Sequence, residues 1–234
     1  PKPGAADILN SGQASSPQTD CLQRGAMIAK LPAWCFNCRC YLSRPRRSAS
    51  SFLCSTCHGK LPFIKQSICN HCGLDHQTDD CQESWARHID AFQALFYYRD
   101  PIHHWIVNHK YSGGFFAGRI LREFVYSWFQ ENANGLVGIE AVLPVPINPL
   151  RLRQRGFNQT QFLLNTQRII PVRSGWLKKK RRTAQQAGLT AKARRKNVQG
   201  AFTVKGDVSG RNLMVFDDVC TTGQTLGEVC STLK

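Results

Sequence analysis

The fold of this 234-residue chain is decided by the stretch Val215-Phe216-Asp217-Asp218-Val219-Cys220-Thr221-Thr222-Gly223-Gln224-Thr225. With the preceding Asn212-Leu213-Met214, its apolar start predicts a buried parallel strand that ends at the acidic pair. A Thr-Thr-Gly turn follows, and a helix is predicted from about Thr225. Strand, loop and helix in this order predict an α/β fold built on a parallel sheet.

The same stretch has the residue types of a site for a ribose phosphate. A phosphate binds backbone N–H groups and hydroxyls at a helix N-terminus, and ribose hydroxyls bind carboxylates. Asp217 and Asp218 supply the carboxylates at the strand end, where parallel sheets place ligands. The turn into the helix supplies Thr221, Thr222, Gly223, Gln224 and Thr225. The alternative is a strand end and a helix cap without a ligand, although a cap needs only one of these residues.

The apolar pattern predicts five further elements ahead of this stretch. Two are strands, at 91–98 and 141–146, and three are helices, at 102–109, 116–130 and 157–168. The strand at 141–146 is a continuous apolar run, as is typical of a buried parallel strand. It supports the same α/β class.

Cysteines gather in one part of the chain, since eight of the eleven lie between Cys35 and Cys81 and six of these form C-x-x-C pairs. Cys35-x-x-Cys38 and Cys54-x-x-Cys57 have the spacing of a four-cysteine zinc ribbon, in which the Zn²⁺ is structural. The alternative is a pair of redox dithiols. Because this region has few apolar residues, we expect metal to supply its stability.

A second zinc site is predicted from Cys69-x-x-Cys72 and Cys81. Three nearby histidines are candidates for its fourth ligand: His71, His76 and His88. Alternatively the site is incomplete, because a lone histidine is more often exposed than a ligand. Cys220 and Cys230 are expected to be packing residues.

The net charge of +16 is unevenly distributed. Between Ala141 and Gly206 there are fifteen Lys and Arg residues and no Asp or Glu. This segment predicts an anionic partner, which is a pyrophosphate, a nucleic-acid backbone or an anionic membrane surface, or else it is a solvated basic face. No apolar run reaches the length of about 18 residues that a membrane span needs, and no signal peptide is recognisable. Together with the clustered cysteines, this favours the cytoplasm.

The acidic pair and its Thr-Thr-Gly-x-Thr turn resemble the phosphoribosyl-pyrophosphate (PRPP) signature of type I phosphoribosyltransferases. Three other motifs narrow the resemblance to the ComF/GntX family: Arg155-Gly156-Phe157-Asn158-Gln159, Thr183-x-x-Gln186-x-Gly188-Leu189 and Arg194-x-x-Asn197-x-x-Gly200-Ala201-Phe202. In that family, cysteine knuckles precede a phosphoribosyltransferase domain. The resemblance extends from about Met27 to Lys234, and at Ser84 this chain lacks a cysteine that the family pattern offers.

Three regions are therefore expected. Residues 1–26, rich in Ser, Gly, Pro, Ala and Gln, are a disordered leader or an added remnant. Residues 27–88 form the zinc-ribbon module. Residues 89–234 form a type I phosphoribosyltransferase-like parallel sheet with helices on both faces. We expect its C-terminal end to be truncated, because this fold normally continues into further sheet.

The resemblance also implies roles for single residues. Asp217 and Asp218 bind the ribose hydroxyls and stabilise the cationic sugar of the transition state, and the turn from Thr221 to Thr225 binds the 5-phosphate of PRPP, which arrives with Mg²⁺. The pyrophosphate faces the loop after residues 141–146, where Arg151, Arg153 and Arg155 cluster. A flap over 178–197, which contains Arg182 and Arg194, closes over it. The run 178–182 is alternatively a solvated or nucleic-acid-binding surface.

Two functions follow from these features. The first is an enzyme that transfers a phosphoribosyl group from PRPP to an unknown acceptor. The second is a non-catalytic accessory protein that binds single-stranded DNA and has a regulatory or vestigial PRPP pocket. The resemblance implies a link to the uptake or use of DNA, and hence proteins of the DNA-uptake machinery as partners.

Overall fold

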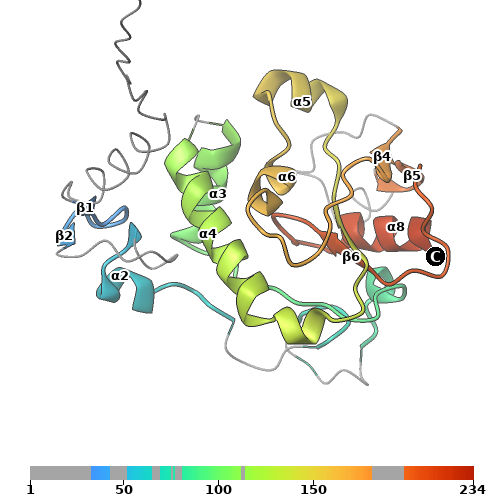
Figure 1. Ribbon diagram of the computed structural model, residues 1–234, viewed down its shortest axis with the longest axis horizontal. Helices are drawn as coiled ribbons and strands as arrows, with labels where there is room; N and C mark the ends of the chain where they lie inside the picture. Colours follow the sequence, from blue (N-terminus) through green and yellow to red (C-terminus); the bar gives the residue numbers. More distant parts are fainter. Residues whose placement is uncertain are drawn as a thin grey trace, which may run out of the picture.

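The computed structural model describes residues 33–42, 52–64, 69–74, 76, 81–111, 114–180 and 198–234. Its strands are β1 (Ala33–Trp34), β2 (Tyr41–Leu42), β3 (Ala141–Pro144), β4 (Leu177–Lys179), β5 (Phe202–Val204) and β6 (Leu213–Phe216). Its helices are α2 (Ser55–Gly59), α3 (Ile102–Tyr111), α4 (Phe115–Glu131), α5 (Pro149–Arg155), α6 (Gln159–Leu164) and α8 (Gln224–Leu233), with short 3₁₀ helices η3 (Ser84–Ala86) and η4 (Ala133–Leu136). Figure 1 shows their arrangement.

The strands form three small sheets, and the parallel one contains the two strands predicted from their apolar runs. β3 pairs with β6 in parallel, from Ala141 opposite Leu213 to Pro144 opposite Phe216. On the other edge of β3, the Val142 amide donates to the Pro171 carbonyl at 2.9 Å, and a parallel bridge joins Val142 to Val172. β3 is therefore covered on both edges, and all four of its residues are buried.

Helices cover both faces of this sheet. Met214 and Phe216 point to one face, where they pack with Phe129 of α4 and Leu164 of α6. Val215, one residue along, points to the other face and packs with the apolar side of α8. This alternation is the period of two that a strand imposes. In Figure 1, α4 and α6 lie on one side of β6 and α8 lies on the other. The predicted mixed α/β class with a parallel sheet is confirmed.

The helices predicted at 102–109 and 116–130 are confirmed as α3 and α4. The helix predicted at 157–168 is shorter, because α6 ends at Leu164 and the Gln167 side chain then accepts from the amides of Ile169 and Ile170. These amides are thus bonded outside a helix.

The strand predicted at 91–98 is wrong. Within it, only Phe96 pairs, in one antiparallel bridge with Phe63. The Phe96 ring packs edge-to-face on Phe124 of α4, with 5.2 Å between ring centroids. Phe96 thus packs against a helix, and among the described residues the segment has no long partner strand.

The first cysteine-rich segment packs against α3 and α4. Cys35, Cys57 and Leu61 share a buried cluster with Trp105 of α3 and Ile120 of α4. The antiparallel hairpin of β1 and β2 and the short helix α2 carry these cysteines. Among the residues that the structure describes, no helix is both long and apolar enough to cross a membrane.

Candidate functional site

The predicted phosphate turn lies between the end of β6 and the start of α8. One pocket is lined by the following residues of this connection: Asp217, Val219, Cys220, Thr221, Thr222, Gly223, Gln224, Thr225 and Leu226. Gly223 is the N-cap of α8 and has a φ of 65°, in the left-handed region that glycine adopts at little cost. The structure therefore brings Asp217 and all five predicted turn residues to the positive end of a helix.

The two acids of the pair point in different directions. Asp217 lines the pocket, and its Oδ1 accepts from the Asp218 amide at 2.9 Å. The Asp218 carboxylate instead pairs with Lys110 at the end of α3, with 2.7 Å between Nζ and Oδ2. Burial, together with the neighbouring negative charge of Asp218, raises the pKa of Asp217 to about 8. Asp217 thus holds a proton at neutral pH when no ligand is bound.

Lys110 also lines a basic cavity of about 330 Å³. It is lined by His109, Lys110, Tyr111, Arg151, Gln154, Arg155 and Phe157. The arginines come from α5. Its N-cap is Asn148, whose side chain accepts a hydrogen bond from the Leu150 amide, and its C-cap is Gly156, which has a φ of 79°. Arg155 stacks over the Tyr111 ring at 4.6 Å. An anion with several charges fits this lining.

The predicted arginines do not all lie in this cavity. Arg151 and Arg155 line it, whereas Arg153 is exposed and does not line it. Arg182 and Arg194 lie outside the described residues, as does the rest of the segment 181–197. The leader 1–26 lies outside them too.

His109 forms the apolar wall of the cavity. It is 6% exposed, and its ring lies 5.1 Å from the Phe157 ring and 4.9 Å from the Phe162 ring. Burial lowers its pKa, so the imidazole is neutral at physiological pH. The ring also fills the space beside Gly118, where a Cβ would overlap it. These contacts make His109 a packing residue as well as part of the cavity wall.

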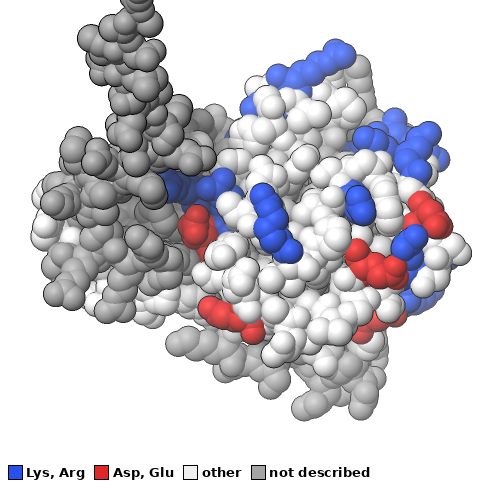
Figure 2. All heavy atoms as spheres, viewed as in Figure 1, with Lys and Arg blue, Asp and Glu red and all other residues white. Residues whose placement is uncertain are grey.

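Lys179 brings a further cation close to the phosphate turn. Burial lowers its pKa and so does the positive charge of Arg151, while the charge of Asp217 acts in the opposite direction. Its Nζ lies over the Phe202 ring at 5.3 Å, whereas its neighbour Lys178 is exposed. The basic run from residue 178 is therefore not a uniform solvent-facing surface. Figure 2 shows Lys and Arg side chains over α5 and beside β4 on one face of the molecule.

The sequence indicates Lys179 only as part of the basic segment 178–197, and it does not indicate Lys110 as a site residue. Lys110 is separated from Asp218 by more than a hundred residues, and only the packing of α3 brings them together. Within the chain, the available signal was a lysine directly after the helix predicted at 102–109, followed after two further residues by Gly-Gly. Such a lysine also interacts favourably with the helix dipole, so the pattern alone does not identify a site.

The first cysteine group has the geometry of a metal site. The sulfur atoms of Cys35, Cys38, Cys54 and Cys57 all lie within 4.8 Å of one another. Cys38 and Cys54 are 3.7 Å apart, close to the separation of about 3.8 Å between two thiolates on a tetrahedral Zn²⁺. The Cys57 amide donates to the Cys54 sulfur at 3.4 Å, which supports a thiolate. The predicted four-residue set fits a structural zinc ion.

The second group is completed by a histidine. Cys69, Cys72 and Cys81 gather with His76, and all four ligand atoms lie within 4.8 Å of one another. The Cys72 sulfur is 3.0 Å from His76 Nε2. His71 instead has its Nδ1 2.9 Å from the Ile89 carbonyl. Three soft sulfur ligands and one imidazole suit zinc.

Cys69 of this second group is more acidic than Cys220 of the phosphate turn and Cys230 of α8. Burial alone would raise the pKa of Cys69, but backbone amides of His71 and Cys72 act against it and bring the pKa to about 6. Burial raises the pKa of Cys220, and likewise of Cys230, to about 11. These two thiols are protonated and inert, as expected for packing residues.

Comparison with known proteins adds relatives of similar length. Competence protein F of Haemophilus influenzae is 31% identical over 216 residues, which cover 85% of this chain and 92% of that protein. DNA utilization protein YhgH of Escherichia coli K12 is 27% identical over 225 residues, covering 87% of this chain and 91% of that protein. Competence protein ComFC of Streptococcus pneumoniae is 24% identical over 193 residues, covering 80% and 84% respectively. No protein-family model matches the chain.

Proposed function

This chain belongs to the ComF family of competence and DNA-utilization proteins, and from that premise we propose that it binds PRPP with Mg²⁺ in a type I phosphoribosyltransferase-like domain. The observation that carries the proposal is the pocket in which Asp217 meets the Thr-Thr-Gly-Gln-Thr turn at the N-terminus of α8. Backbone amides and threonine hydroxyls of this turn hold the 5-phosphate. Asp217 and Asp218 accept from the ribose hydroxyls.

The basic cavity takes the diphosphate end of the same ligand. Lys110 lies between the two regions, since it pairs with Asp218 and also lines the cavity. Arg151 and Arg155 supply the remaining positive charge, and their planar guanidinium groups suit phosphate oxygens. Mg²⁺ that arrives with PRPP adds neutralisation of the diphosphate charge. A ribose that carries a phosphate at one end and a diphosphate at the other thus matches the phosphate turn and the basic cavity, with the acidic pair between them.

The reaction that this arrangement supports is phosphoribosyl transfer to an acceptor. The bond from the anomeric carbon to the diphosphate oxygen breaks, and its electron pair leaves with pyrophosphate. A nucleophilic atom of the acceptor forms the new bond and loses its proton. Asp217 and Asp218 stabilise the positive sugar between these events, and the cationic cavity stabilises the leaving group.

A melting scan tests the proposal. Mg²⁺ with PRPP is expected to raise the Tm of the protein, by more than Mg²⁺ with ribose 5-phosphate does, because only PRPP occupies the cavity as well. Repeating the scan with candidate acceptors, while pyrophosphate release is followed, separates binding from transfer. An unchanged Tm at millimolar PRPP would contradict the proposal.

Binding of single-stranded DNA is a second function, favoured by the family and by two exposed lysines, one in β4 and one directly after it. Lys178 and Lys180 are exposed and lie within the acid-free segment between Ala141 and Gly206. Phosphate contacts make binding fall steeply as salt rises. We therefore expect Lys178→Ala with Lys180→Ala to weaken DNA binding and to reduce its salt dependence, with PRPP binding kept. Proteins of the DNA-uptake machinery are the corresponding partners, and the cytoplasm is the corresponding compartment.

A further inference from the structure

Trp85 packs directly against the phosphate turn. It lies in η3, four residues after Cys81, and is 8% exposed. A Cβ added to Gly223 would overlap the six-membered ring of Trp85, and one added to Gly227 would overlap the Trp85 carbonyl. The turn and the first turn of α8 therefore rest directly on this residue, and glycines at both positions permit the close approach.

Trp85 is also joined to the second cysteine group. It shares one buried cluster with Cys69 and Cys72. Phe92 packs edge-to-face on Trp85, with 6.1 Å between ring centroids, and covers Gly73, where a Cβ would overlap the Phe92 ring.

Two hydrogen bonds hold the segment around Trp85 to the same knuckle. The Phe92 amide donates to the Asn70 carbonyl, and His71 Nδ1 lies 2.9 Å from the Ile89 carbonyl. The knuckle of residues 69–73 thus holds the segment that follows Trp85 at two points, Ile89 and Phe92. A displacement of the knuckle is expected to displace Trp85 with it.

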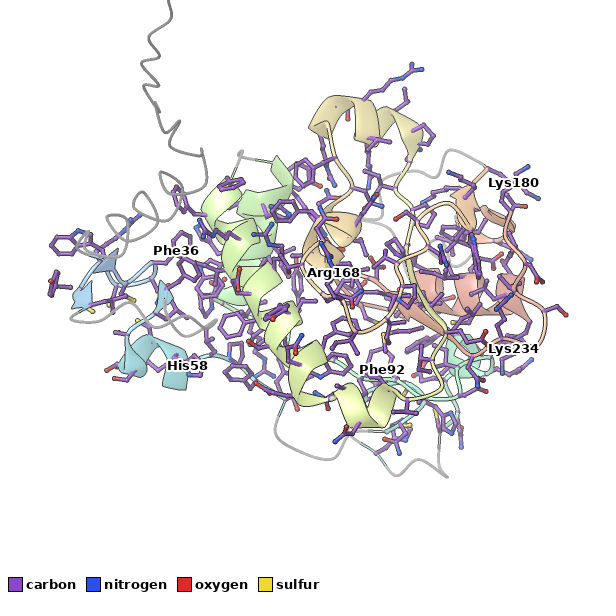
Figure 3. All side chains as sticks on the ribbon, in the orientation of Figure 1. Phe36, His58, Phe92, Arg168, Lys180 and Lys234 are labelled. Atoms are coloured by element: carbon purple, nitrogen blue, oxygen red, sulfur yellow. The ribbon has the colours of Figure 1, made fainter. Side chains whose placement is uncertain are left out.

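The first cysteine group does not share a buried cluster with Trp85. Cys35 and Cys57 lie in a different buried cluster, with Trp105 and Ile120. Figure 3 shows Phe36 and His58 of that module on one side of α3 and α4, and Phe92 and Lys234 on the other. The two metal-ligand groups therefore offer a matched pair, of which only the second shares a core with Trp85 and α8.

We propose that Trp85 is a positioning residue for the phosphate turn, through which metal binding at Cys69, Cys72, His76 and Cys81 sets the affinity of the turn for its phosphate ligand. The inference rests on the proposed function, because it takes the turn to be a ribose-phosphate site. Metal held by these four ligands keeps the knuckle folded. The folded knuckle holds Trp85, and Trp85 holds Gly223 and the amides that follow it. Coupling of this kind is reciprocal, so phosphate binding must retain the metal by the same factor.

The test measures both directions of the coupling in the full chain. PRPP affinity is measured by calorimetry, and zinc release to a coloured chelator is followed with and without Mg²⁺ and PRPP. His76→Ala and Trp85→Ala are expected to weaken PRPP binding about tenfold, within the range usual for coupling between sites. In the wild-type protein, PRPP should slow the loss of one zinc ion and leave the loss of the other unchanged.

Two control variants separate this coupling from a general loss of stability. Cys38→Ser removes a ligand of the first group and should leave PRPP affinity unchanged. Trp176→Ala removes a tryptophan that covers Gly206 as Trp85 covers Gly223, and should also leave it unchanged. If Trp85→Ala does not fold, Trp85→Phe replaces it, because a smaller aromatic ring alters the contact with Gly223 less severely.

The outcomes distinguish the two proposals. A wild-type protein that does not bind PRPP overturns the proposed function and this inference with it. A wild-type protein that binds PRPP, with His76→Ala and Trp85 variants that bind it equally well, overturns the coupling alone. Equal weakening by Cys38→Ser would also overturn it, since the effect would then not be specific to the second group.

Discussion

Lys110 and Asp218 form an ion pair between the end of α3 and the connection from β6 to α8, with 2.7 Å between Nζ and Oδ2. Both side chains are mostly buried, at 20% and 13% exposure. This ion pair links the basic cavity to the phosphate turn. It holds Asp218 at Lys110, whereas the neighbouring Asp217 lines the pocket of the turn. It is a tertiary contact on which the proposed ligand site depends.

Lys110→Met should destabilise the ligand-free protein, because the carboxylate of Asp218 then has no counter-ion beside Asp217. We expect a loss of about 1–2 kcal/mol, less than for a fully buried pair because water still reaches the site. Urea unfolding measures it. Lys234→Met is the control, since the pair of Lys234 with Asp90 is exposed and should contribute little. Equal losses in both variants would contradict the structural role of Lys110.

Asp217 should make the ligand-free protein less stable as the pH rises. Its pKa is about 8 in the folded protein and about 4 when unfolded, so the folded form holds a proton that the unfolded form has released. The stability that this carboxyl contributes is complete below about pH 4 and is lost as the pH rises towards 8. Asp217→Asn should therefore raise the Tm at pH 8 and change it little at pH 4. Thermal unfolding of both proteins across this range measures the difference, and a difference that does not vary with pH would refute the pKa assignment.

Gly200 and Gly223 have the same φ of 65°. Comparing an alanine substitution at each therefore separates the cost of backbone strain from the cost of overlap with Trp85. Gly200 has open space where a Cβ would lie, whereas at Gly223 the Cβ would overlap the Trp85 ring. Gly200→Ala should cost about 1 kcal/mol, for the left-handed backbone alone. Gly223→Ala should cost a further 1–3 kcal/mol or so, because the ring has to move within a packed core. Equal free energies of unfolding for the two variants would show that Trp85 does not support the turn.

Arg151 and Arg153 provide a matched pair for the basic cavity. They lie two residues apart on α5, but only Arg151 lines the cavity. Arg151→Gln should weaken binding of Mg²⁺ with PRPP about tenfold, as expected for the loss of one charged hydrogen-bond donor to a phosphate. Arg153→Gln should leave it nearly unchanged. Calorimetry on both variants measures this, and a stronger effect at Arg153 would move the diphosphate to another surface.

The sequence predicts well those parts of the site that are close together along the chain. The acidic pair and the turn from Thr221 to Thr225 lie within nine residues, so strand, turn and helix place them without help from distant segments. Cys35, Cys38, Cys54 and Cys57 were predicted because each C-x-x-C knuckle is also local. The sequence narrowed the fourth ligand of the second group to three histidines, and the fold selects His76.

The parts that the sequence does not predict depend on tertiary packing. Lys110 reaches Asp218 because α3 packs beside the parallel sheet, and Trp85 reaches Gly223 because the second knuckle packs on α8. In the strand predicted at 91–98, aromatic residues that pack against helical segments, such as Phe96 on α4 and Phe92 on Trp85 of η3, have the same pattern as residues of a sheet. Hydrophobicity alone does not distinguish these two environments.

Calorimetry with Mg²⁺ and PRPP, on the wild-type protein and on the double variant Asp217→Asn with Asp218→Asn, tests the central claim most directly. Asp207→Asn is the control, because Asp207 is an exposed acid paired with Arg211 and lies outside the proposed site. The account predicts binding to the wild-type protein and the control, and none to the double variant. Binding of equal strength to all three would contradict the assignment of the turn as the PRPP site.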